Sequence, residues 1–207
     1  ADKVSINSKK GSVATGGNVT ANNEVDIDAA NNITANGSLT STNANVDLLA
    51  GGSITTNGTV NALNNVIANA NGNINTNGDV TATNGKAVLN SSTGSVNTQN
   101  VTAGQAVDID AKQDITAGGN LISNSGDITL DAGGSITTGG EVKAQKNVDY
   151  NAKGSITTKG IINSKAGNIH LQTDAAKGDI TFGGDVTADH GNINIDVLQN
   201  GRLHYRS

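Results

Sequence analysis

Apolar residues recur along the whole chain about every twenty positions, each directly after a turn residue. The spacings between successive members are 20, 21, 20, 22, 19, 21, 20 and 24 residues. These anchor residues are Val13, Ile33, Ile54, Ile74, Val96, Ile115, Ile136, Ile156 and Ile180. A fixed period of this length predicts a stacked solenoid, in which no repeat can bury its apolar side alone. Function is therefore expected along a repeating surface rather than in a single pocket.

Two further sets of apolar positions lie between successive anchors. One residue follows most anchors by six positions, and an apolar pair separated by one mostly polar residue then precedes the next anchor. The first set is Val19, Leu39, Val60, Val80, Leu121, Val142, Ile162 and Val186, with Val101 one residue early. The pairs include Val25/Ile27, Val46/Leu48, Val107/Ile109, Ile128/Leu130, Val148/Tyr150, Ile169/Leu171 and Ile193/Ile195. This alternation predicts three strands per coil, each of about four to five residues with one buried face.

Small and flexible residues occupy fixed places between these predicted strands. Glycine stands four residues after the anchor in every coil except one, where Asn100 takes that place. Both residue types tolerate the left-handed region of φ, so we expect the backbone to make the same bend in every coil. An Ala or Ser two residues after the second apolar position is expected to fit a tight corner of the core.

Together these features predict an all-β fold, a right-handed parallel β-helix (solenoid) with three short strands per coil of about 20 to 21 residues. About nine to ten coils would form a rod of roughly 40–45 Å at the ~4.8 Å spacing of hydrogen-bonded strands. We expect residues 1–200 to form a single shaft, and residues 201–207 to start another coil or to be a remnant at its edge. An α-helical solenoid is excluded, because no long stretch carries apolar residues at a 3.6-residue period.

Composition and charge narrow the classes of function. The 207 residues include no Cys, which excludes disulfides, cysteine metal ligands and a thiol nucleophile. Thirteen basic and 18 acidic side chains give a net charge of −5 without blocks of either sign, so nucleic-acid binding is not expected. No apolar run approaches the about eighteen residues of a spanning helix, so membrane insertion is not expected either. The chain does not begin with Met, and we expect it to be a segment of a longer protein.

Three segments of the chain resemble haemagglutinin-type repeats, at residues 72–82 (GNINTNGDVTA), 107–119 (VDIDAKQDITAGG) and 128–144 (ITLDAGGSITTGGEVKA). Such repeats form the shafts of filamentous haemagglutinin-like exoproteins of two-partner secretion systems in Gram-negative bacteria. The resemblance covers about Val4 to Val197 and implies a β-helix that is secreted or displayed on the bacterial cell surface. It implies a role in adhesion or in carrying a contact-dependent inhibition toxin. The family's NPNG-type secretion motif is absent, so we expect shaft rather than export signal.

The resemblance also implies partners for the full-length protein. One is the outer-membrane transporter of the two-partner secretion system, and another is a host or bacterial surface glycan or receptor. The segment itself is expected to be monomeric with a tendency to associate end to end, because unpaired strand edges template further pairing.

The residue after each anchor is expected to point outward and to form a ladder along one face. Six of these nine residues are Thr, and the set is Ala14, Thr34, Thr55, Asn75, Asn97, Thr116, Thr137, Thr157 and Thr181. One interpretation is an ice-binding plane or a flat carbohydrate-binding strip. The other is structural, because Thr favours strands and stacks on its own kind across them. The Asn interruptions favour the structural interpretation.

A second outward ladder is acidic, and its members are Asp26, Asp47, Asp108 and Asp149. Carboxylates stacked in adjacent coils could bind a divalent cation. The same place in the intervening coils is expected to hold Ile67, Leu89 and Thr129. Because spacing like charges apart is what a structural surface would do, we expect neither a metal site nor a cofactor.

No catalytic set emerges from the sequence, and we do not expect an enzyme. Polysaccharide-active β-helix enzymes need clustered carboxylates, or a carboxylate near Arg or Lys, in a cleft walled by long loops. The coils here are nearly uniform, with one clear insertion at residues 173–177, and the only Arg residues are Arg202 and Arg206. The three histidines are expected to be lone surface residues: His170, His190 and His204.

One tripeptide, Lys177-Gly178-Asp179, resembles a variant integrin-binding motif beside the insertion. Gly178 also fills the regular turn place before the anchor Ile180, which favours a structural interpretation of the motif.

Overall fold

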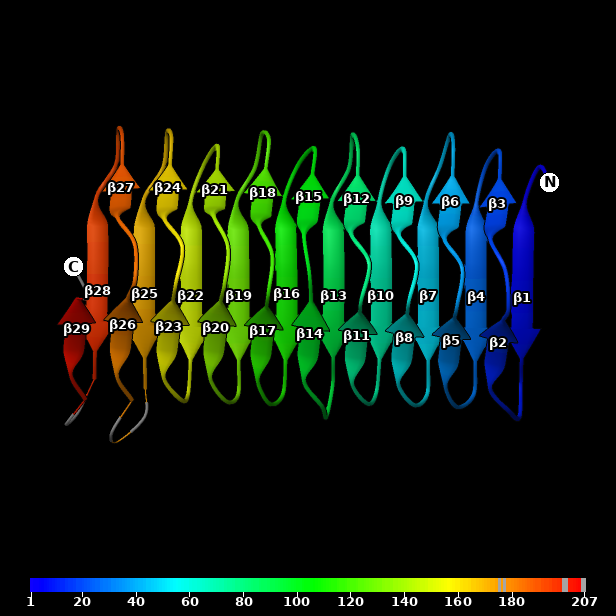
Figure 1. The fold of residues 1–207 in the computed structure, drawn as a ribbon, viewed down its shortest axis with the longest axis horizontal. Coiled ribbons are helices and arrows are strands. Elements are labelled where there is room, and N and C mark those ends of the chain that lie inside the picture. The colour runs from blue at the N-terminus through cyan, green and yellow to red at the C-terminus, as the bar shows by residue number, and fades with distance from the viewer. Residues whose placement is uncertain (175, 177, 199–200, 206–207) are drawn as a thin grey trace.

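The computed structural model describes residues 1–174, 176, 178–198 and 201–205, and it shows a rod of stacked coils (Figure 1). Its 29 strands form three parallel sheets, which the chain visits in turn as it winds. Strands β1 and β29 lie at opposite ends of the rod (Figure 1). The predicted all-β parallel solenoid with three strands per coil is thereby confirmed.

The sheets are named A, B and C in the order in which the chain first enters them. Sheet A has ten five-residue strands: β1 (Val4–Ser8), β4 (Val25–Ala29), β7 (Val46–Ala50), β10 (Val66–Ala70), β13 (Ala87–Ser91), β16 (Val107–Ala111), β19 (Ile128–Ala132), β22 (Val148–Ala152), β25 (Ile169–Thr173) and β28 (Ile193–Val197). Sheet B has ten three-residue strands: β2 (Val13–Thr15), β5 (Ile33–Ala35), β8 (Ile54–Thr56), β11 (Ile74–Thr76), β14 (Val96–Thr98), β17 (Ile115–Ala117), β20 (Ile136–Thr138), β23 (Ile156–Thr158), β26 (Ile180–Phe182) and β29 (Leu203–Tyr205). Sheet C has nine: β3 (Val19–Ala21), β6 (Leu39–Ser41), β9 (Val60–Ala62), β12 (Val80–Ala82), β15 (Val101–Ala103), β18 (Leu121–Ser123), β21 (Val142–Ala144), β24 (Ile162–Ser164) and β27 (Val186–Ala188).

Identical positions of successive coils lie directly above one another. In sheet B, for example, Ile74 pairs with Ile54 on one side and with Val96 on the other. The first and third residues of each short strand point inward, and the second points outward, which gives the predicted period of two. Strands in sheets B and C are shorter than predicted, because each leaves only one outward residue between two corners. The core is a continuous stack of buried Ile, Val, Leu and Ala.

Corner serines lengthen some of the turns by one residue. Ala21 is followed by a three-residue turn into β4, whereas Ser41 is followed by a four-residue turn into β7. The Ser41 hydroxyl accepts a hydrogen bond of 3.1 Å from the N–H of Ala44 and donates to the Asn23 carbonyl of the preceding coil. Four other corner serines, all of which precede four-residue turns, accept from the N–H three residues ahead: Ser8, Ser91, Ser123 and Ser164. These corners therefore do more than fit a tight space, and each of the four that lie between anchors adds one residue to the period of its coil.

Glycine is needed four residues after the anchor because the coils approach one another closely there. A Cβ on Gly58 would lie 2.5 Å from the carbonyl carbon of Gly37, and a Cβ on Gly160 would lie 2.2 Å from the Gly140 oxygen. None of these glycines has φ in the left-handed region. The predicted reason, a left-handed bend, is therefore wrong. The backbone of the coil below leaves no room for a side chain.

The expectation that Asn100 replaces this glycine is also wrong. The Val80 N–H donates to the Asn100 carbonyl, in the same way as the Val60 N–H donates to the carbonyl of Asp79. Asn100 thus aligns with Asp79, and its Nδ2 lies 2.9 Å from the Asp79 Oδ1. This coil lacks the glycine position altogether, which explains why Val101 follows its anchor by five residues instead of six.

Candidate functional site

A ladder of side-chain hydrogen bonds runs along the rod at the residue just before each anchor. The side-chain oxygen of this residue accepts from the backbone N–H of its counterpart in the next coil, at 2.7–3.3 Å. Its members are Ser12, Asn32, Ser53, Asn73, Ser95, Asp114, Ser135, Ser155, Asp179 and Arg202. Arg202 carries no acceptor and ends the ladder. The ladder joins every coil to the next beyond the sheets themselves.

A second, interrupted ladder lies at the residue before the sheet A strands. Asn45 accepts from the N–H of Asn65 at 3.0 Å, and Asn65 accepts from the N–H of Lys86 at 2.9 Å. The ladder stops at Lys86, whose side chain offers no acceptor, and it resumes further along at Asp127, Asn147, Asn168 and Asn192. The sequence predicted the residues of both ladders only as turn formers. The first ladder is nevertheless visible in the sequence, because Ser, Asn or Asp precedes all nine anchors.

The predicted threonine ladder lies on the outer side of sheet B as a single file. Thr116, Thr137, Thr157 and Thr181 stack over four consecutive coils, and Thr34 stacks on Thr55. Asn75 and Asn97 interrupt the file, and the Asn97 Nδ2 donates to the Asn75 Oδ1 at 2.9 Å. Each short strand exposes only one outward residue, so this surface is a strip one side chain wide rather than a plane.

Sheet A presents the wider face, because each of its strands exposes two outward residues. None of the outward residues of its ten strands is Lys or Arg, and eight are aspartates: Asp26, Asp28, Asp47, Asp108, Asp110, Asp131, Asp149 and Asp196. The sequence predicted only one acidic column, whereas the VDID pattern of β4 and β16 supplies two. Negative charge is therefore concentrated on one side of the rod.

The predicted acidic column needs one correction. Asp26 and Asp47 are direct neighbours on β4 and β7, and Thr129 separates Asp108 from Asp149 as expected. Leu89 does not occupy the outward place of β13, because its side chain is buried. Val88 takes this place and pairs with Ile67 on one side and Asp108 on the other.

The carboxylates near the start of this face are poorly compensated. The Lys3 ammonium lies 2.6 Å from Glu24 and 3.9 Å from Asp26. Its hydrogen bond to Glu24 lowers the pKa of that carboxyl. Partial burial, a hydrogen bond with Glu24, and the charges of Glu24 and Asp26 raise the pKa of Asp47 to about 6. Burial also raises the pKa of Asp108 and of Asp110.

His170 is not a lone surface residue, contrary to the sequence-based expectation. Its Nδ1 lies 3.2 Å from the Asp149 Oδ1 and its Nε2 lies 3.2 Å from the Asp196 Oδ2, so it bridges β22, β25 and β28. Only a doubly protonated ring can donate to both carboxylates. His204 also has a partner, Asp179 at 3.5 Å, whereas His190 forms no ion pair with the described residues. The described part of the chain contains no group of three His, Asp or Glu side chains placed to hold a metal ion.

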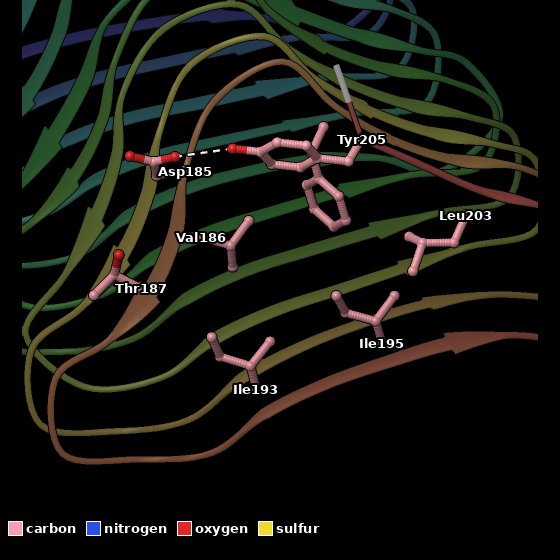
Figure 2. A pocket seen from close by; sticks show the side chains of 8 residues that line it. Asp185, Val186, Thr187, Ile193, Ile195, Leu203 and Tyr205 are labelled. Carbon is pink, nitrogen blue, oxygen red and sulfur yellow. Dashed lines mark hydrogen bonds between the residues drawn. The ribbon is translucent and has the colours of Figure 1, made fainter. Parts of the chain in front are cut away.

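An open hollow of about 420 Å³ lies at the end of the rod formed by β27, β28 and β29, the last described strands of the three sheets (Figure 2). Its lining is mainly apolar and consists of Phe182, Asp185, Val186, Thr187, Ile193, Ile195, Leu203 and Tyr205. The Tyr205 hydroxyl donates to the Asp185 Oδ1 at 3.0 Å, which also raises the pKa of this tyrosine. The lining holds one carboxylate, so it lacks the pair used in general acid–base hydrolysis.

The remaining sequence candidates lie near this end. Lys177 of the tripeptide, Arg206 and Ser207 fall outside the described residues. Asp179 takes part in the side-chain ladder, where its carboxylate accepts from the Arg202 N–H at 2.8 Å. Leu203–Tyr205 forms β29 and pairs with β26, adding a strand to sheet B.

Among the described residues there is no helix long and apolar enough to cross a bilayer.

Comparison of the chain with protein-family models, with curated proteins and with solved structures found no match. The class of protein that the fold defines is a three-sheet parallel β-solenoid repeat protein. Its candidate surfaces are the side-chain ladder, the threonine strip of sheet B, the acidic face of sheet A and the apolar hollow at one end.

Proposed function

We propose that this chain is a shaft segment of a large bacterial exoprotein, secreted or displayed on the cell surface, that projects a distal adhesive or toxic domain. The observation that carries this proposal is the side-chain ladder, which continues through ten coils without interruption. A chain selected for one binding pocket has no need for the same hydrogen bond in every coil. A spacer does, because its stiffness is limited by its weakest junction.

The resemblance to haemagglutinin-type repeats supplies the biological setting of the proposal. In this setting the full-length protein crosses the outer membrane through its two-partner transporter and folds coil upon coil outside. Ile74 and Ile136 are fully buried, so placing Asp at both positions should block stacking. Surface yield of the full-length protein should then fall sharply, while Thr137→Ser, an outward change, should leave it unaltered. Equal yield for all three proteins would contradict the folding-coupled export.

The spacer role is tested by changing the number of coils. Deletion of residues 54–73 removes one coil and joins Ser53 to Ile74, which preserves both the anchor and the ladder position. Small-angle scattering should then show a rod shorter by about 4.8 Å with the same cross-section. In cells that display the full-length protein, adhesion should survive this deletion. Loss of adhesion despite correct folding and display would contradict a pure spacer.

The alternative function is direct binding of a glycan or receptor on the threonine strip. The four-coil run from Thr116 to Thr181 is the observation that favours it. A glycan array and a cell-binding assay on the 207-residue chain distinguish the two functions. Binding that is lost in Thr137→Ala/Thr157→Ala would favour the strip, whereas absence of binding would favour the spacer.

A further inference from the structure

An exposed apolar cluster interrupts the acidic face of sheet A. Leu49 on β7 is 55% exposed, and Ile67 on β10 and Val88 on β13 are partly exposed beside it. Ile67 and Val88 are directly opposed, and Leu49 is the diagonal neighbour of Ile67, within reach across the sheet. Figure 1 shows β7, β10 and β13 as consecutive strands of the same sheet. These three residues are called the apolar step.

Carboxylates bracket the apolar step on both sides along the rod. Asp26 and Asp28 lie on β4, and Asp47 lies on β7 beside Leu49, whereas Asp108, Asp110 and Asp131 lie on β16 and β19, the two strands that follow β13. Asp26 directly opposes Asp47, and Asp110 directly opposes Asp131. Like charges opposed in this way destabilise a sheet. The fold itself does not require them, since sheets B and C carry mostly Thr and Asn at their outward positions.

The negative charge at the brackets is only partly compensated by the described residues. Lys3 forms salt bridges with Glu24 and Asp26, and the charge of Lys86 opposes the rise in the pKa of Asp108. No other salt bridge joins a Lys to this face among the described residues. Partial burial is the main cause of the raised pKa of Asp47, and the nearby charges of Glu24 and Asp26 add to it. A cation placed over Asp47 would lower this pKa again, so that binding of a basic partner near pH 6 would release a proton.

The size of the surface indicates the kind of partner. From β4 to β19 there are five strand-to-strand steps, about 24 Å, and a five-residue strand is about 16 Å long. The resulting face of roughly 400 Å² is about half of what each partner buries in a stable complex of two folded proteins. A peptide segment fits this area. Its two basic groups would be about 14–19 Å apart, which corresponds to three to four coils between Asp47 or Asp26 and Asp108.

We propose that the apolar step and its two carboxylate brackets form a docking site for a basic–apolar–basic peptide segment that lies along the rod. The apolar residues of the segment cover Leu49, Ile67 and Val88, and its basic residues at either end face the two brackets. A second copy of this face cannot be the occupant, because it would bring two sets of carboxylates together. The site is independent of the spacer function, since a rod with an occupied or an empty face has the same length.

The probe is a fluorescent peptide, acetyl-Lys-Lys-Val-Leu-Val-Leu-Lys-Lys-amide, titrated with the 207-residue chain. Two control peptides are used. One carries Glu in place of every Lys, and the other carries Ser in place of the four apolar residues. Two protein variants remove one feature each: Leu49→Ser/Val88→Ser removes the apolar step, and Asp108→Asn/Asp110→Asn removes one bracket. A matched control, Ile161→Ser/Asp189→Asn, changes an exposed apolar residue and a carboxylate elsewhere on the rod.

The expected result is saturable binding of the Lys peptide that weakens about tenfold in each site variant and stays within about twofold in the matched control. Circular dichroism checks that all variants are folded. Calorimetry near pH 6 in two buffers of different ionisation enthalpy should show proton release that is absent in Asp47→Asn. Equal binding of the Ser peptide would reduce the site to non-specific charge attraction and overturn the proposal. Absence of binding at about 1 mM, or unchanged binding by both site variants, would also overturn it.

Discussion

Replacing Gly58 by Ala separates two reasons for the glycine that recurs four residues after the anchor. The new Cβ would lie 2.5 Å from the Gly37 carbonyl carbon and 2.6 Å from the Ser38 nitrogen, both backbone atoms. Relief to an ordinary contact requires an opening of about 1 Å, which would stretch the 2.9 Å bond between the Leu39 N–H and the Thr59 carbonyl. Overpacking and the weakened bond should cost about 3 kcal/mol, offset by about 0.4–1 kcal/mol from the stiffer unfolded chain. The net loss is expected to be about 2 kcal/mol.

Gly17 provides the matched control for Gly58. It occupies the same place in the first coil, but a Cβ there would meet nothing within 4 Å. Gly17→Ala should therefore be neutral or stabilise the protein by up to about 1 kcal/mol. Urea unfolding, analysed with a nearest-neighbour scheme because repeat proteins need not unfold in one step, measures both changes. Amide exchange should locate the Gly58→Ala loss at β8 and β9. Equal losses for both variants would refute the stacking explanation and restore a conformational one.

Three further predictions concern the ladder, the core and the acidic face. Ser135→Ala removes the acceptor for the Ser155 N–H and should lower the free energy of unfolding in urea by about 1 kcal/mol. Ser135→Asn should keep the stability, because Asn73 accepts the same bond in its own coil. Equal stability of the original protein and both variants would contradict a contribution from the ladder. Tyr150→Phe should stabilise the fold by about 1–2 kcal/mol, because the buried Tyr150 hydroxyl has no hydrogen-bond partner among the described residues. A loss of stability would instead show that this hydroxyl forms a hydrogen bond with Thr138, the neighbour that opposes the rise in the pKa of Tyr150. Folding raises the pKa of Asp47 from 3.8 to about 6, so protonation of this carboxyl stabilises the fold fully below the unfolded pKa, and this stabilisation is lost as the pH rises through about 6. After discounting for solvent screening, the stabilisation amounts to about 1 kcal/mol. Asp47→Asn should therefore remove this part of the pH dependence of stability, measured by urea unfolding between pH 4 and 7.

The solenoid could be predicted from the sequence because its core is encoded by position alone. Ile54, Ile74 and Val96 recur at near-constant spacing, and their pairing in sheet B follows directly from that spacing. The side-chain ladder was also visible, as Ser, Asn or Asp before every anchor, but its hydrogen bonds depend on the next coil. Residue types at one position show that a turn exists. They do not show which atom of a neighbouring coil the side chain meets.

The errors have a common physical origin in the distance between coils. Gly58 looks like a residue chosen for its φ until the backbone of Gly37 is placed below it. Asn100 looks like a conservative replacement for glycine until the hydrogen bonds of Val80 and Val60 fix the register and reveal a deletion. The bridge from His170 to Asp196 crosses the sheet diagonally, so no single column of the sequence contains it.

The length of the coils varies only where the fold can absorb it. Four-residue turns follow Ser41 and Ser91, a longer segment follows Thr173, and the inward positions remain in register across all of them. Because corners tolerate insertions and inward positions are fixed by packing, the outward residues of the sheets are the least constrained by folding. Sheets B and C mostly use this freedom for Thr and Asn, which suit strands. Sheet A instead carries directly opposed aspartates around exposed apolar residues. Because opposed like charges lower the stability of a sheet, this arrangement points to selection for a role of the surface rather than for the stability of the fold.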